Sequence, residues 1–188
     1  MLPLFIWVTG AVLFAAFAFF AFAQAAVARN SGQSAADASA LAAAQQARAD
    51  LVRVLGQRVA DGEDWRDLLE NPEITGAPDL SDAAALAGRN GAHLRGPVTV
   101  GSVRGLPAFT AKIEMNSSIG RTVIPGVGAE HAKSSATAVI APRCEAEQAE
   151  GDDFEVSCAG SLFQLSGRDF DPAELPDDSK LFSVYLSD

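Results

Sequence analysis

The chain has no charged residue among its first 28 positions, and Arg29 is the first. Within this stretch only Thr9 and Gln24 are polar, so an ordinary solvated segment is excluded. Residues 2–28 would extend about 40 Å as an α-helix, which exceeds the roughly 30 Å hydrocarbon core of a bilayer. We therefore predict a transmembrane helix over residues 1–29.

Basic residues are also missing before this apolar run, whereas a secretory signal peptide normally opens with them and has a shorter apolar core. Both features argue against cleavage. Small-x-small sites do occur at residues 21–23 and 26–28, so a cleaved signal remains the alternative. Orientation is less clear, because the basic residues that follow the span weakly favour a cytoplasmic C-terminus.

Cysteine is scarce: Cys144 and Cys158 are the only two, and they flank an acidic connection that is typical of a hairpin tip. Paired, they would close a loop of about 15 residues, worth about 3 kcal/mol by the chain-entropy estimate. Two unrelated buried thiols are the alternative reading. Because disulfides persist outside the cytosol, the pair favours an extracytoplasmic C-terminal part.

Groups suited to catalysis are equally few, with two histidines, His93 and His131, and one tyrosine, Tyr185. Neither histidine has metal-ligand spacing with a cysteine. The sequence also contains no Gly-x-Ser-x-Gly elbow and no glycine-rich phosphate loop. We therefore expect no enzymatic activity, no cofactor and no metal site.

Basic residues are nearly absent from the last quarter of the chain. Residues 144–188 contain 12 acidic and 2 basic side chains, and they account for the whole net charge of −10. No basic face accompanies this charge, so a nucleic-acid partner is not expected. The acidic runs at 150–153 and 169–174 lack the oxygen spacing and central glycine of an EF-hand loop, and solvated surface is the preferred interpretation.

Proline is missing between Pro3 and Pro72, and residues 35–60 are almost entirely good helix formers. This composition predicts that the helix continues out of the membrane over residues 30–60, with residues 30–32 as the one point where it would kink. Larger apolar residues form a stripe that would pack on a domain. They are Leu41, Leu51, Val52, Val54, Leu55 and Val59.

The third predicted segment, residues 61–188, begins with a short helix burying Trp65, Leu68 and Leu69, capped by Asp61 or Glu63, and includes a helical turn at 81–87. Strands are then predicted at 97–103, 107–115, 134–142, 154–165 and 181–186, because side chains alternate there in polarity. A glycine-bearing loop is expected at 124–131. A long helix packed on a small antiparallel sheet is an α+β fold.

Small residues at four-residue spacing recur along the helix. They allow helix backbones to approach closely, which is the main attraction between helices in lipid. Gln33 and Asp37 are one turn apart and would bond to a neighbouring helix or to headgroups. We therefore predict an assembly interface, for which leucine at positions 36 and 40 would disturb assembly more than folding. It comprises Ala11, Ala15, Gln33, Ala36, Asp37, Ala40 and Ala44.

Residues 23–51, AQAAVARNSGQSAADASALAAAQQARADL, resemble the membrane-proximal segment of TadE/TadG-like proteins of bacterial tight-adherence (Flp) pili. Members of that group leave an N-terminal span through a Gln-x-Ala-Ala-Asp-Ala-x-Ala-Leu-Ala-Ala-Ala type run, which residues 33–44 match. The resemblance covers about 45 residues with the span. It implies a pilin-like fold and a pseudopilin-like structural or assembly protein of a Flp-type pilus or secretion apparatus.

The chain departs from this family at three points. The position five residues after Gly10 is Ala15 and not glutamate, which argues against prepilin-peptidase processing. The sequence contains no complete Asp-x-Ser-x-Ser metal site of the larger members, and Asp37-Ala38-Ser39 is an incomplete match inside the helix, so their von Willebrand A domain is not expected. Relatives also begin with a short basic stretch, which leaves open whether the true start lies upstream of Met1.

Three functional classes follow from the sequence. The first is a single-pass cell-membrane protein whose extracytoplasmic domain is presented by a span that packs against other single-span or pilin-like proteins, self-association included. The second is a membrane-tethered extracytoplasmic binding module. The third, an enzyme, would require His93 or His131 to lie beside an acid and a hydroxyl in a pocket.

Overall fold

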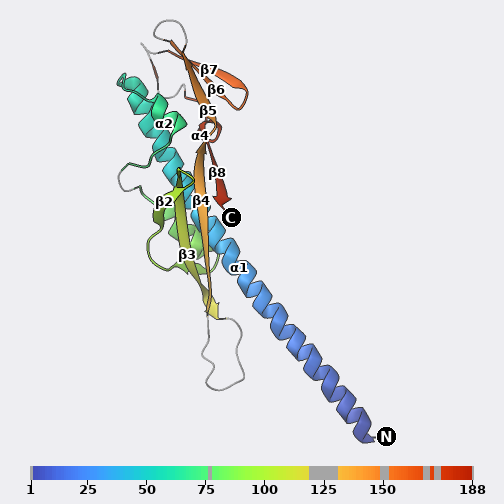
Figure 1. The fold of residues 1–188 in the computed structure, drawn as a ribbon. Helices are drawn as coiled ribbons and strands as arrows, with labels where there is room; N and C mark the ends of the chain where they lie inside the picture. The colour runs from blue at the N-terminus through green and yellow to red at the C-terminus, as the bar shows by residue number, and fades with distance from the viewer. Residues whose placement is uncertain are drawn as a thin grey trace.

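The computed structural model describes residues 2–75, 78–118, 131–148, 153–166, 170–171 and 175–187. It is an α+β structure in which one long N-terminal helix, α1 (Leu2–Ala60), is followed by two antiparallel sheets and three shorter helices. Figure 1 shows α1 running along the folded part at its C-terminal end and projecting from it at its N-terminal end. We call the described residues from Gly32 onward the head.

α1 is one uninterrupted helix of 59 residues, so the predicted continuation out of the apolar run is confirmed and the helix does not break at residues 30–32. The absence of proline after Pro3 leaves its hydrogen-bond ladder intact. Gly32 has a packing role instead, because a Cβ there would lie 3.0 Å from the Ser134 hydroxyl oxygen and 3.7 Å from the Ala132 Cβ. The missing side chain lets the helix cross the sheet at close range.

Two short helices follow α1. α2 (Arg66–Glu70) buries Leu68 and Leu69 beside Trp65, as predicted. The predicted cap by Asp61 or Glu63 is wrong, because it is the Asp64 carboxylate that accepts a hydrogen bond from the Arg66 backbone N–H at 3.2 Å. α3 (Ser81–Arg89) extends the predicted turn at residues 81–87 to nine residues. It buries Ala83 and Ala87.

The larger sheet is antiparallel, with β1 (Ala92–Leu94), β3 (Leu106–Ser118), β4 (His131–Pro142) and β8 (Phe182–Ser187) in that order, and β2 (Thr99–Val103) also paired to β3. Strands therefore form at the four segments predicted for this sheet, 97–103, 107–115, 134–142 and 181–186, whereas β1 was not predicted. The glycine-bearing loop predicted at 124–131 lies outside the described residues except for His131, which begins β4.

β3 shows how alternation builds the core. Phe109, Ala111, Ile113 and Met115 lie on one face and are at most 7% exposed, while Lys112 on the other face is exposed. The apolar stripe of α1 packs on this face, with Leu51, Leu55 and Val59 buried and the remaining three residues partly buried. The predicted packing of the helix stripe on the sheet is confirmed.

The smaller sheet contains β5 (Cys144–Gln148), β6 (Asp153–Cys158) and β7 (Ser161–Ser166). The single strand predicted at 154–165 is wrong: Ala159 and Gly160 adopt φ values of 49° and 86° and turn the chain between two strands. Cys144 and Cys158 are directly opposed in β5 and β6 and form a disulfide. The bond joins the two ends of the hairpin.

Candidate membrane-anchoring segment and its junction with the head

Residues 3–28 of α1, called here the apolar segment, extend away from the head, and only their last turns lie beside it. Their large side chains are exposed, from Phe5 at 74% and Trp7 at 80% to Phe22 at 78% and Val27 at 65%. The helix is long and apolar enough to cross a membrane, and its most apolar window is 0% buried. Exposed apolar surface on this scale is costly in water and favourable in hydrocarbon.

The structure separates the predicted assembly residues into two groups. Ala11 and Ala15 lie on the exposed apolar segment, where a second helix has access to them. Gln33 and Asp37 lie near the start of the head, where the Gln33 amide donates a 2.7 Å hydrogen bond to the Asp37 carboxylate. These two polar groups therefore satisfy one another within the helix.

Ala36, Ala40 and Ala44 were predicted to face another chain, and this part of the prediction is wrong. Each is 0% exposed. Ala36 belongs to a cluster with Ala87 of α3 and residues of the sheet, and Ala40 and Ala44 belong to the main core. The alanine run lets the chain's own sheet and α3 approach α1 closely.

A groove, called here the junction groove, separates the upper end of the apolar segment from the end of β3. The α1 side of it is largely apolar, with Gln24 and Ser31 as its polar members, and the β3 side ends in two serines. Its lining residues are Phe20, Ala23, Gln24, Val27, Ala28, Ser31, Met115, Ser117 and Ser118. β3 thus reaches down beside the helix turn that contains Gln24 and Val27.

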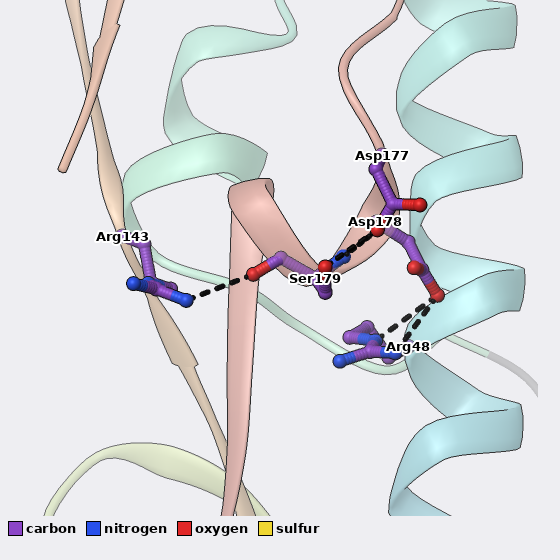
Figure 2. A network of polar contacts seen from close by, with 5 residues as sticks. All are labelled: Arg48, Arg143, Asp177, Asp178 and Ser179. Atoms are coloured by element: carbon purple, nitrogen blue, oxygen red, sulfur yellow. Dashed lines mark hydrogen bonds and ion pairs between the residues drawn. The ribbon is translucent and has the colours of Figure 1, made fainter. Parts of the chain in front are cut away.

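Higher on α1, a polar contact fixes the C-terminal part of the chain to the helix (Figure 2). Arg48 pairs with Asp178 at 3.1 Å, with the two side chains only 16% and 33% exposed. Asp178 begins α4 (Asp178–Leu181), which leads directly into β8. Arg143, between β4 and β5, donates a 3.0 Å hydrogen bond to the Ser179 carbonyl oxygen. α4 is therefore held from both sides.

Asp177 is the N-cap of α4. The Ser179 hydroxyl donates to its carboxylate at 2.5 Å and the Ser179 backbone N–H at 2.9 Å. These two hydrogen bonds hold the pKa of Asp177 below its usual value of 3.8. The arrangement is an ordinary helix cap, and it positions the neighbouring Asp178 for Arg48.

Each of the two histidines has a hydrogen-bond partner from β3 within the described residues. His93 Nδ1 lies 2.8 Å from the Asn116 amide oxygen, and His131 Nδ1 lies 2.6 Å from the Met115 carbonyl oxygen. Among the described residues, no group of three or more His, Cys, Asp or Glu side chains is arranged to hold a metal ion. The acidic runs at 150–153 and 169–174 lie outside the described residues apart from Asp153, Phe170 and Asp171.

The sequence alone did not predict the junction groove or the gathering of basic residues at the same end of the head. Arg29, Arg89 and Lys133 come from α1, α3 and β4, and only the fold brings these elements to one end of the head. The one available signal was Gln24, a single polar side chain late in the apolar run.

No protein-family model matches the chain, and neither does any curated protein sequence or solved structure.

Proposed function

We propose that the chain is a membrane-anchored, pseudopilin-like structural or assembly protein of a Flp/Tad-type pilus or secretion apparatus. In this proposal the apolar segment crosses the cell membrane once and the head stands outside the cytosol. The observation that carries it is α1 itself, one helix that is bare and apolar over residues 3–28 and becomes the core of the head from Gly32 onward.

A helix shared by anchor and head supports a structural role more than a tethering role. A binding module needs only a flexible link to its membrane span, whereas here the span and the head form one continuous element without a proline or a kink. Movement or packing of the span is therefore transmitted directly to the head. The resemblance of residues 23–51 to TadE/TadG-like proteins supports the same role.

The disulfide supports the extracytoplasmic location of the head. Cys144 and Cys158 both belong to the head and are 3% exposed. Disulfides form and persist in oxidising compartments.

Lateral assembly, in this proposal, uses the apolar segment, because Ala36, Ala40 and Ala44 are occupied within the head. Ala11 and Ala15 lie one turn apart, and their small side chains would admit a neighbouring helix at close range. Ala15→Leu would place a large side chain on this face. Ala16→Leu is the matched control, since residue 16 lies about 100° further around the helix.

The test is photo-cross-linking of the full chain in membranes that contain tight-adherence pilus machinery. We expect Ala15→Leu to reduce cross-linking between span helices by at least fivefold and Ala16→Leu to leave it unchanged. Equal cross-linking in both variants would contradict assembly through this face. Recovery of the protein only with a discrete soluble partner, and never with other span proteins, would favour the binding-module class instead.

A further inference from the structure

Charge is distributed unevenly along the long axis of the molecule. The end of the head nearest the apolar segment is formed by residues 29–37, 87–95, 112–118 and 131–135, which contain five basic and two acidic side chains. The opposite end, formed by residues 61–70, 144–148 and 153–166, contains nine acidic side chains and one basic side chain. Three further basic residues, Arg58, Arg143 and Lys180, border it, so it keeps an acidic excess. Figure 1 places α2 and β5 to β7 at the end far from the N-terminus.

Three of the five basic residues at the end of the head nearest the apolar segment, called here the basic end, come from three different elements. Arg29 is exposed on α1 one turn before Gly32. Arg89 is exposed at the end of α3, two residues after the buried Ala87. Two residues further on, the Gly91 carbonyl oxygen accepts a hydrogen bond from the Asn116 backbone N–H, which fixes this end of α3 to β3. Lys133 is exposed near the start of β4, 3.8 Å from Glu114. That carboxylate is shared with Arg95 at 3.4 Å, so the cluster keeps a positive excess.

The junction groove fixes how far the basic end stands from the hydrocarbon. The end of β3, with Ser117 and Ser118, lies beside Gln24 and Val27 of α1. Backbone and hydroxyl groups exposed at a strand end require water or polar partners and do not lie in hydrocarbon. The hydrocarbon part of α1 would then end near Ala23. From Pro3 to Ala23 the helix rises about 31 Å, which equals the thickness of a bilayer core.

With the bilayer at this height, the junction groove lies in the headgroup layer, and the basic end begins at Arg29, about 9 Å above Ala23 along α1. The groove offers apolar side chains such as Phe20 and Val27 on one wall, and Gln24, Ser117 and Ser118 as polar groups. A phospholipid has the same division between acyl chain and headgroup. Basic side chains at this level attract anionic lipids, each one favouring their binding by about fivefold near the surface.

We propose that the basic end of the head binds the headgroups of anionic phospholipids in the membrane that α1 crosses, with one lipid seated in the junction groove. This inference rests on the membrane anchoring in the proposed function. Membrane anchoring by α1 does not require the basic residues of the head, and lipid binding would give them a function. The acidic opposite end lies about 40 Å further along α1, several screening lengths of about 8 Å away, so the lipids act on the basic end alone.

The experiment uses the full chain. In one sample, assembly of the chain into lipid nanodiscs tests whether it enters a bilayer. In a second sample, the chain is held in detergent micelles that contain phosphatidylglycerol and phosphatidylcholine in equal amounts. Native mass spectrometry measures which lipid stays bound. The test variant is Arg89→Gln with Lys133→Gln. The matched control, Arg53→Gln with Arg104→Gln, removes the same charge from exposed residues outside the basic end.

We expect the unmodified chain to retain phosphatidylglycerol in preference to phosphatidylcholine, the test variant to lose that preference by 10-fold or more, and the control to keep it. Circular dichroism establishes that both variants are folded. An unmodified chain with no preference, or equal losses in test variant and control, would overturn the inference while leaving the anchor intact. Failure of the chain to enter nanodiscs would overturn both the inference and the proposed anchoring.

Discussion

Ala40 lies on the part of α1 that forms the centre of the head. It is 0% exposed and packs in the main core, so a larger side chain there would overpack the head. Ala40→Leu is expected to lower the free energy of unfolding by about 1–3 kcal/mol. Ala49→Leu, at an exposed position of the same helix, should leave stability within about 0.5 kcal/mol. Thermal unfolding of the full chain in detergent, followed by circular dichroism, measures both changes, and equal stability of the two variants would contradict the assigned packing.

Asp177 gives a prediction of pH dependence at the same scale. Its pKa is lowered by hydrogen bonds from the Ser179 hydroxyl and backbone N–H. A carboxyl with a depressed folded pKa contributes stability above its unfolded value of about 3.8, and the contribution is lost as the pH falls through the folded value. Ser179→Ala removes the first of these donors. We expect the Asp177 pKa to rise towards 3.8, as measured by NMR of the side-chain carboxyl carbon. Ser183→Ala, whose hydroxyl bonds Ala141, is the control that should change nothing.

At the scale of elements, Arg48 and Asp178 join α1 to α4 across 130 positions of sequence. Because the pair is partly buried, a double-mutant cycle with Arg48→Gln and Asp178→Asn should give a coupling of about 1 kcal/mol. The pair Arg53 and Asp50, which is 61% and 41% exposed, serves as the matched control and should give less than about 0.5 kcal/mol. Chemical unfolding of the four proteins in each cycle measures the two couplings. Equal couplings would mean that α4 is held by its other contacts.

The disulfide acts on a second element, the hairpin of β5 and β6. It closes a sequence separation of 14 and should stabilise the head by about 3 kcal/mol by restricting the unfolded chain. Replacing both Cys144 and Cys158 with serine should lower the denaturant midpoint, and a reducing agent should lower that of the unmodified chain by the same amount. A reductant that shifts the midpoint of the serine variant as well would show that the effect does not come from this bond.

The periodicity of the sequence predicted some of these elements and not others. The alternating face of β3 and the continuous helix could be predicted, because both depend on local order along the chain. The sequence could not show whether Ala36, Ala40 and Ala44 pack against another chain or against this chain's own sheet and α3, because a small side chain admits a helix or a sheet equally well. The turn at Ala159 and Gly160 was missed because only its second residue is a glycine. β1 has three residues and exists only through its pairing with β3.

At the scale of the whole molecule, the basic end and the junction groove were beyond sequence reasoning, because their residues come from distant parts of the chain. The helix α1, which we propose to be membrane anchor and head core at once, joins the two ends of the molecule. If so, the full-length chain stays in the membrane, and the disulfide forms while the anchor is retained.

The most direct test is the intact mass of residues 1–188, expressed in bacteria and recovered from carbonate-washed membranes under non-reducing conditions. The account predicts the full 19.5 kDa chain, lighter by two hydrogens for the bond between Cys144 and Cys158, in the membrane fraction. A soluble product cut near residue 23 or residue 28 would contradict it, because the apolar segment would then be a removed signal and not an anchor.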